Sequence, residues 1–456
     1  MPDSTTLKNV LFAAYWFPPG GEHGVQRAAK FCKYLPDFGY RPLVLTGQEK
    51  DIRHKLDPSL LADVRDTKVF RCAGFERFLV QLPLKMGLEV LLWLVLRPDQ
   101  NVLSWLPAAR RMASKIAEEY PISAIYATML PMSDALLGLK LKKLLGVPLI
   151  VDYRDPWTTC ARSVWPTRLH YWWESRQERR VLSEADAVVV VTPTMKERLV
   201  RKFPECEGKT HVIYNGFDLQ DLPPEREAPG KGPLRIGFAG VLTGHDSRQR
   251  GARLGILSKF FCYRNELTDY STGSPYYLLH ALRALLDESP DLAGQISLTF
   301  AGKFGQSNWQ VVEELDLQGV VSFKGYIPHN ESIRLLSDSD VLFMPMQSPP
   351  DGQRSYNLSG KIFEYLGTKR PILATVPEGD LRDVLDRARA GWCVDPRDVD
   401  GIKSLLGKLV KKKMAGTLST TQDQQYVMQF ERRELTRQLA ELLDSLTSNG
   451  KKKVMP

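Results

Sequence analysis

Residues 9–46, NVLFAAYWFPPGGEHGVQRAAKFCKYLPDFGYRPLVLT, show the order of patterns that determines the fold class. Residues 9–15 and 41–46 are short apolar runs, which are typical of buried strands. Between them lie a glycine-containing loop and an amphipathic segment. The apolar side chains of that segment fall on one helical face: Val25, Ala28, Ala29, Cys32 and Leu35. A strand, a covering helix and a second strand in this order predict a parallel sheet.

The same alternation of strand-like and helix-like segments continues along the chain. Further apolar runs occur at residues 123–128, 148–153, 187–192 and 211–215. The stretch 221–233, DLPPEREAPGKGP, is rich in Pro, Gly and charge and predicts a linker. The alternation then restarts, with runs at residues 234–240, 296–302, 320–325, 341–346, 371–376 and 391–396. We therefore predict an α/β protein with two doubly wound domains, residues 1–220 and 234–421.

The end of the chain carries one more helical pattern. Residues 424–446 place Leu435, Leu439, Leu442 and Leu446 on one face, which must pack against an apolar surface. We expect the segment 422–447 to pack back on the first domain, and residues 448–456 to form a solvated tail.

Composition limits the class of protein. A chain of 456 residues with 43% hydrophobic and 25% charged residues is globular and exceeds one core. Its six cysteines form no CxxC pair, so neither a zinc site nor a disulfide framework is indicated. The start lacks the pattern of a secretory signal, and the longest apolar run, Leu88 to Leu96, is about half of a membrane span. We expect a cytoplasmic protein, or one peripheral on the inner face of the cell membrane.

The charge of the chain favours an anionic partner. A net charge of +9 and a pI near 9.1 fit a phosphate ligand, a nucleic acid or an acidic membrane surface. No nucleic-acid-binding motif is present, so we expect no nucleic acid. Residues 75–98 and 162–180 mix aromatic and basic side chains, which suits lipid headgroups or, alternatively, helices packed on the sheet. The basic stretch 242–274 could bind phosphate, contact lipid or contact a partner.

The loop after the first strand is a candidate anion site. Gly20 and Gly21 allow the backbone to approach a ligand closely, and the helix that follows presents its positive end. The loop matches neither GxGxxG nor GxxxxGK[ST], so a turn that needs glycine conformations explains it equally well.

A second candidate lies in SGKIFEYLGTKRPILA, residues 359–374. This short helix carries Lys361 and Glu364 three residues apart, on one face, after the strand at 341–346. A nucleoside diphosphate needs a cation for its phosphates and an acceptor for its ribose hydroxyls, which Lys and Glu supply. The alternative is a surface ion pair worth a few tenths of a kcal/mol.

Five stretches in the same order resemble the GT4-like group of GT-B glycosyltransferases. They are residues 13–46, VDYRDPW (151–157), VIYNGFD (212–218), RIGFAG (235–240) and GKIFEYLGTKRPIL (360–373). The resemblance implies two Rossmann-like domains facing each other across a cleft, with the C-terminal helix crossing back. It implies a nucleotide-sugar donor, a UDP- or GDP-sugar, in the second domain. It also implies a polysaccharide, glycan or lipid-linked acceptor in the first.

The resemblance also suggests roles for single residues. Glu364 is similar to the carboxylate that holds the donor ribose, and Lys361 to a lysine that contacts the diphosphate. Gly20 and Gly21 resemble the loop whose amides meet the donor phosphate. With Lys303 as a further cation and no DxD-type cluster in a convincing place, we expect no metal and no other cofactor.

The chain departs from the family pattern at two positions. A second glutamate common near the donor sugar is replaced by Tyr356, so we expect Asn357 or Ser359 to make that contact. A histidine common in the loop that corresponds to residues 129–137 is absent, and Ala135 is the matching residue. These losses support an alternative, a catalytically weak or inactive module that binds a nucleotide sugar or a partner transferase.

The stereochemistry of the reaction decides whether a side-chain base is needed. A retaining enzyme of this fold is thought to let the leaving phosphate accept the proton, whereas an inverting enzyme needs a base. Asp155 and Asp152 of VDYRDPW are our candidates, followed by His23. A salt bridge of Arg154 that caps the strand explains VDYRDPW equally well. The sequence does not determine the nucleotide base or the sugar of the donor. It also does not determine the acceptor or the oligomeric state.

Overall fold

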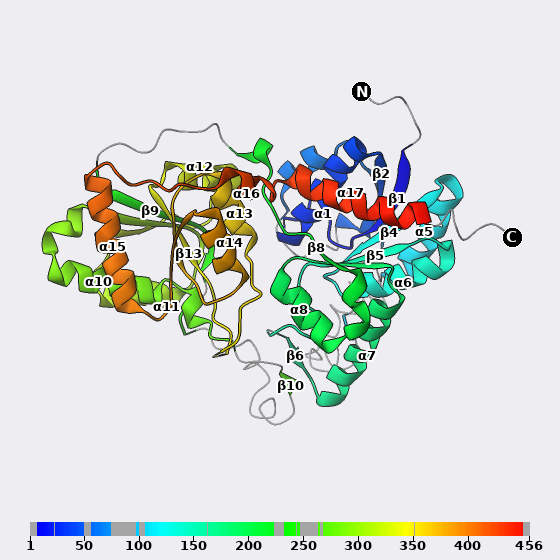
Figure 1. Cartoon of the computed structure of the whole chain (residues 1–456), viewed down its shortest axis with the longest axis horizontal. Helices are drawn as coiled ribbons and strands as arrows, with labels where there is room; N and C mark the ends of the chain where they lie inside the picture. The colour runs from blue at the N-terminus through cyan, green and yellow to red at the C-terminus, as the bar shows by residue number, and fades with distance from the viewer. Residues whose placement is uncertain are drawn as a thin grey trace. The chain divides into compact units, whose positions relative to one another are not determined.

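The computed structural model divides the chain into two compact α/β units (Figure 1). It describes residues 7–449, apart from residues 22, 50–55, 74–96, 100–104, 162, 223–231, 243, 247–262, 265–267 and 351. Unit 1 comprises residues 1–215, 261–265 and 432–456, and unit 2 comprises residues 216–260 and 266–431. Most of the predicted linker 221–233 and of the predicted stretches 75–98 and 242–274 lies outside the described residues.

Unit 1 contains a seven-stranded sheet in the order β3-β2-β1-β4-β5-β7-β8. All neighbouring strands are parallel, as predicted. The strands are β1 (Lys8–Ala13), β2 (Tyr40–Gly47), β3 (Lys68–Cys72), β4 (Ile122–Thr128), β5 (Leu149–Tyr153), β7 (Ala187–Val190) and β8 (Thr210–Val212). The sequence missed β3, because its edge position leaves only Cys72 of its five residues buried.

Helices cover both faces of this sheet because its strands carry apolar side chains on both faces. Phe12 and Tyr126 face α1 (His23–Tyr34) and α17 (Arg432–Asn449), in one core with Leu435 and Leu439. Figure 1 shows α17 beside α1. The other face carries α6 (Ser133–Leu145) and α5 (Leu106–Glu119), and the unit also contains α7 (Arg168–Glu184) and α8 (Pro193–Lys202).

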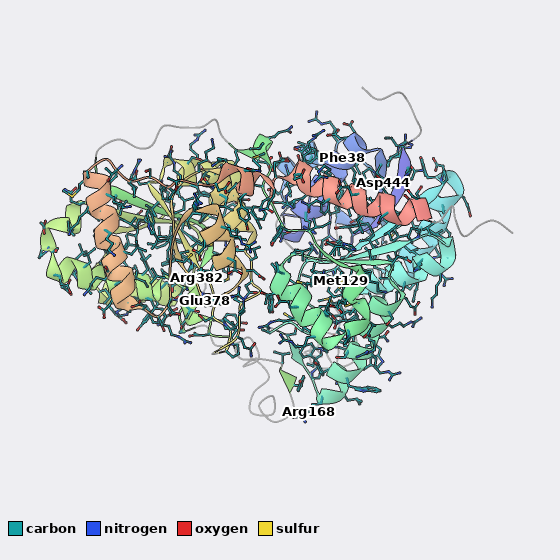
Figure 2. All side chains as sticks on the ribbon, in the orientation of Figure 1. Phe38, Met129, Arg168, Glu378, Arg382 and Asp444 are labelled. Carbon is teal, nitrogen blue, oxygen red and sulfur yellow. The ribbon has the colours of Figure 1, made fainter. Side chains whose placement is uncertain are left out.

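The C-terminal segment is not the single helix predicted at residues 424–446. It forms α16 (Gln424–Met428) in unit 2 and α17 in unit 1, with a break at residues 429–431. The break occurs at Phe430, which is fully buried and contacts the ring of Phe363 with centroids 5.1 Å apart. Its carbonyl accepts a hydrogen bond from the amide of Phe217 at 3.1 Å. Within α17, Asp444, labelled in Figure 2, accepts a hydrogen bond from the hydroxyl of Tyr40.

Unit 2 contains a six-stranded parallel sheet in the order β12-β11-β9-β13-β14-β15. The strands are β9 (Leu234–Leu242), β11 (Ile296–Phe304), β12 (Val321–Phe323), β13 (Val341–Pro345), β14 (Ile372–Thr375) and β15 (Gly391–Val394). One face packs on α10 (Tyr276–Glu288), α11 (Gln306–Glu314) and α15 (Val399–Met414). The unit also contains α12 (His329–Asp338), α13 (Gly360–Gly367) and α14 (Asp380–Ala388). Every strand predicted for this half of the chain is confirmed.

The basic stretch 242–274 contributes a short strand to unit 1. Its residues β10 (Tyr263–Arg264) pair in antiparallel fashion with β6 (Val164–Trp165). The ring of Tyr263 lies 4.5 Å from that of Tyr171, centroid to centroid. Among the described residues, no helix is both long enough and apolar enough to cross a membrane.

Candidate functional site

Two glycines bring the backbones of β9 and β11 close together at the carboxyl edge of the unit 2 sheet. Gly240 has a φ of 141° and Gly302 a φ of 115°, values that other residues rarely adopt. A Cβ added to Gly302 would lie 2.0 Å from the carbonyl oxygen of Gly240. Open parallel sheets bind their ligands at this edge. Both strands contain the letters FAG, and this shared motif is a signal from which the sequence could have predicted the pair.

Lys361 places its amine against this glycine edge. Its Nζ lies 5.2 Å from the ring centroid of Phe238, and a Cβ on Gly240 would approach its Cε to 2.1 Å. Burial lowers the pKa of Lys361, and the charge of Glu364 opposes that shift. No residue that the structure describes accepts a hydrogen bond from this amine. A half-buried ammonium without an acceptor is costly unless an anion binds to it.

Glu364 lies one turn further along α13 and is also half-buried. The amine of Lys361 lies over Phe238 rather than on this carboxylate. Both side chains are half-buried, so the exposed ion pair that the sequence left open does not describe them. The structure brings Lys361 and Glu364 together on one face of α13, as their spacing predicted.

The loop before α13 presents two more predicted residues. Asn357 and Ser359 are half-buried. The two residues on either side of Asn357, Tyr356 and Leu358, are buried. The side chain of Ser359 does not cap α13, so the first amides of the helix remain available to a ligand. Lys303, near the end of β11, is exposed. The sugar contact of Asn357 or Ser359 and the phosphate contact of Lys303 stay predictions.

The glycine loop of unit 1 is held to a neighbouring segment. Gly20 is buried and forms an isolated bridge with Leu56, while Gly21 is exposed. The amide of Asp57 donates to the carbonyl of Pro19 at 2.7 Å. The side chain of His23 lies outside the described residues. Phosphate binding by Gly20 and Gly21 therefore stays a prediction.

Arg154 of VDYRDPW lies against the start of α1. Its Nε and Nη2 each donate at 2.7 Å, to the carbonyls of Met129 (labelled in Figure 2) and Leu130. A Cβ on Gly24 would lie 1.4 Å from its Nη1, so a side chain at this position would displace the guanidinium. The predicted salt bridge is absent among the described residues, because main-chain carbonyls hold the guanidinium instead. Burial lowers the pKa of Arg154, and the charges of the nearby Asp152, Asp155 and Asp134 oppose that shift.

Asp152 was predicted as a general base, and its surroundings do not fit that role. Its carboxylate is fully buried, receives both Nε and Nη2 of Arg27 at 3.0–3.2 Å, and accepts from Thr128 at 3.0 Å. Arg27 in turn donates to the carbonyls of Ile213 and Tyr214. A carboxylate saturated in this way cannot reach a substrate proton. The pair instead joins α1 to β5 inside unit 1.

Asp155 is half-buried and lies just after β5, at the carboxyl edge of the unit 1 sheet. The residues that follow it are firmly packed. Trp157 donates its indole N–H to Glu174 of α7 at 2.8 Å. Thr158 hydrogen-bonds Glu178, whose pKa burial raises to about 7. Asp155 therefore sits on a fixed loop and remains the candidate base.

The sequence missed a buried carboxyl at the same edge. Asp134, in the first turn of α6, accepts the backbone N–H of Tyr15 at 2.9 Å and is fully buried. Burial raises the pKa of Asp134 well above its usual value. It is adjacent to Ala135, the residue that matches the absent histidine. An alignment by motif alone could not identify it, because its burial depends on the fold.

Comparison with known proteins matches two families along the chain. Residues 24–221 match the model of Glycosyltransferase Family 4, and residues 271–412 match that of Glycosyl transferases group 1. A relative in Salmonella typhimurium is WcaL, described as a colanic acid biosynthesis glycosyltransferase. It is 22% identical over 276 residues, which are 54% of this chain and 67% of WcaL.

Solved structures share the fold over almost the whole chain. Alr3699/HepE of Anabaena, solved with UDP and glucose, has a TM-score of 0.56 and 16% identity, covering 96% of this chain and 100% of HepE. Sucrose-phosphate synthase of Thermosynechococcus elongatus has a TM-score of 0.61 and 16% identity, covering 97% and 100%. At this identity the likeness shows the fold, and function has to come from the site.

Proposed function

Because this chain belongs to the glycosyltransferases of family 4 and group 1, enzymes that move a sugar from a nucleotide sugar to a glycan acceptor, we propose that Lys361 and Glu364 hold its donor. The observation that carries the proposal is the position of the Lys361 amine, which is half-buried beside Gly240. No described residue accepts a hydrogen bond from it. A donor diphosphate supplies the missing anion. Its negative charge grows as the glycosidic bond breaks, so a fixed ammonium there stabilises the transition state.

Glu364 gives this proposal a test of its own. We expect Glu364→Ala to weaken UDP binding by about 1–3 kcal/mol, because hydrogen bonds from the ribose hydroxyls to a carboxylate are lost. Isothermal titration with UDP and with 2′,3′-dideoxy-UDP measures this loss, which should vanish for the dideoxy compound. Glu313→Ala, at an exposed position of α11, is the matched control. An equal loss of affinity for both nucleotides would show that Glu364 does not bind the ribose hydroxyls.

The donor and the need for metal are open to one assay. We propose a UDP- or GDP-sugar donor and catalysis without a metal, with the diphosphate charge balanced by Lys361, the start of α13 and Lys303. Slow donor hydrolysis across UDP-, GDP- and ADP-sugars, with and without a chelator, tests both statements. Turnover that a chelator abolishes would contradict metal independence. Thermal protection by nucleotide without any turnover would favour the inactive binding module.

The acceptor side of the reaction involves unit 1. We propose that it holds a glycan or lipid-linked acceptor and that Asp155 acts as base if the reaction inverts. The anomeric configuration of the product, measured by NMR, decides whether a base is needed at all. Retention would leave Asp155 without that role.

We further propose that α7 contacts an anionic membrane surface. Its exposed side chains include Leu169, Trp172 and Trp173, which are 68%, 54% and 39% exposed, and the guanidinium of Arg176 lies 5.1 Å from the ring of Trp172. Aromatic rings beside arginine suit the headgroup region. The alternative, in which the segment 162–180 only packs on the sheet, is wrong for the face of α7 that carries these exposed side chains. Trp165 of the same segment is buried.

Vesicle sedimentation tests the membrane contact. The double variant Trp172→Ser/Trp173→Ser should bind phosphatidylglycerol vesicles at least about tenfold more weakly than the original chain, because two rings no longer enter the headgroup region. Trp309→Ser in unit 2, where Trp309 is 40% exposed, is the control and should bind unchanged. Equal binding of the double variant and the original chain would exclude α7 as the contact.

A further inference from the structure

Unit 1 contains an open cavity of about 530 Å³ beside its sheet edge. Its walls come from the 3₁₀ segment Pro58–Val64, from β3 and from the turn after β1. The lining residues are Pro18, Pro58, Ser59, Leu61, Ala62, Val64, Arg65, Val69 and Arg71. This volume falls within the usual range for small-ligand pockets, roughly 300–1,000 Å³.

The lining combines an apolar surface with positive charge and contains no acid. Leu61, Val64 and Val69 supply the apolar part, and Leu61 is 43% exposed. Arg65 is exposed and has no partner among the described residues. Arg71 donates to the carbonyls of Pro18 and Gly47, which fixes its guanidinium, and burial lowers its pKa while Glu49 at 3.3 Å opposes that shift.

The cavity adjoins the glycine loop. Pro18, in its wall, lies two residues before Gly20, and Gly20 bridges to Leu56 just before the 3₁₀ segment. Arg71 pairs in register with Thr46 near the carboxyl end of β2. The cavity is therefore at the edge where parallel sheets bind ligands. The proposed donor residues Lys361 and Glu364 belong to unit 2 and are not among the residues that line this cavity.

We propose that this cavity binds an amphiphilic phosphate, the lipid-linked phosphate of an acceptor. The phosphate lies between Arg65 and Arg71, and the first carbons of the chain lie on Leu61, Val64 and Val69. The guanidinium of Arg65 can donate two hydrogen bonds to one phosphate, and Arg71, held by the carbonyls of Pro18 and Gly47, adds positive charge. Naming the ligand as an acceptor rests on the proposed glycosyl transfer, whereas the binding itself does not.

Titration calorimetry with decyl phosphate, a single-chain phosphate soluble in water, tests the cavity on the full chain. We expect decyl phosphate to bind more tightly than either inorganic phosphate or decanol. Arg65→Glu should weaken its binding by roughly ten- to a hundredfold, because a charged hydrogen bond is replaced by repulsion. Leu61→Asn, which removes the apolar contact without adding charge, should weaken the binding of decyl phosphate and leave the binding of inorganic phosphate unchanged.

Arg201→Glu makes the same charge change on α8, which packs on β7 and β8 at the opposite edge of the sheet from β3, and should change nothing. Equal decyl phosphate affinity in Arg65→Glu and the original chain would overturn the proposal, as would inorganic phosphate binding as tightly as decyl phosphate. UDP binding, measured in the same samples, should stay unchanged. If decyl phosphate binds as expected but no nucleotide sugar is turned over, the glycosyl transfer fails and the cavity assignment stands.

Discussion

Replacing Lys361 by Met is expected to lower kcat/KM for the sugar donor by about a hundredfold or more. Methionine keeps an apolar stem over Phe238 but removes the charge that faces the leaving diphosphate. Binding should weaken more for UDP than for uridine, because only UDP carries the phosphates. Donor hydrolysis and calorimetry with both ligands measure these effects.

Lys408→Met is the matched control for this variant. Lys408 lies on α15 of the same unit and is exposed, so its replacement should change neither affinity nor rate. Lys361→Arg adds a sharper test, because Gly240 leaves little room for a guanidinium. Equal losses for UDP and uridine in Lys361→Met would show that the lysine does not contact the diphosphate.

Asp152→Ala is expected to destabilise the protein by about 3–5 kcal/mol, the largest stability effect that we predict. It leaves the buried guanidinium of Arg27 without its carboxylate, in surroundings that exclude water. Urea unfolding measures the change. The double variant Arg27→Met/Asp152→Leu removes both charges and should recover a large part of the loss.

Asp287→Ala breaks an ion pair of the same type at the surface, between Arg283 and Asp287 of α10. Its cost should be below about 1 kcal/mol, because water and salt screen exposed pairs. If Asp152→Ala kept the stability of the original chain but lost activity, the residue would be a catalytic base after all, and our structural explanation would be wrong.

The strands were predictable from sequence where the chain passes through the core. The run Val10–Ala13 is buried on both sides, so it is apolar without interruption and recognisable. The edge strand β3 lacks that signal, since Val69, Phe70 and Arg71 are only half-buried. The helix break at Phe430 was also unpredictable, because the residues that contact Phe430 there, Phe217 and Phe363, are distant in the chain.

The candidate site divides in the same way. The spacing of Lys361 and Glu364 was enough to place them on one face of α13, a local property. What gives Lys361 its unusual surroundings is non-local, since Phe238 and Gly240 lie on a strand more than a hundred positions earlier. For Asp152, the partner Arg27 comes from another element 125 positions away in the chain. The sequence alone therefore could not decide whether VDYRDPW supplies a general base or a salt bridge.

A crystal structure with bound UDP tests most directly whether Lys361 and Glu364 hold the donor. We expect the diphosphate within hydrogen-bonding distance of the Lys361 amine, next to Gly240, and the ribose hydroxyls on the carboxylate of Glu364. Nucleotide density elsewhere in the protein, with both side chains facing only solvent or protein, would contradict this assignment.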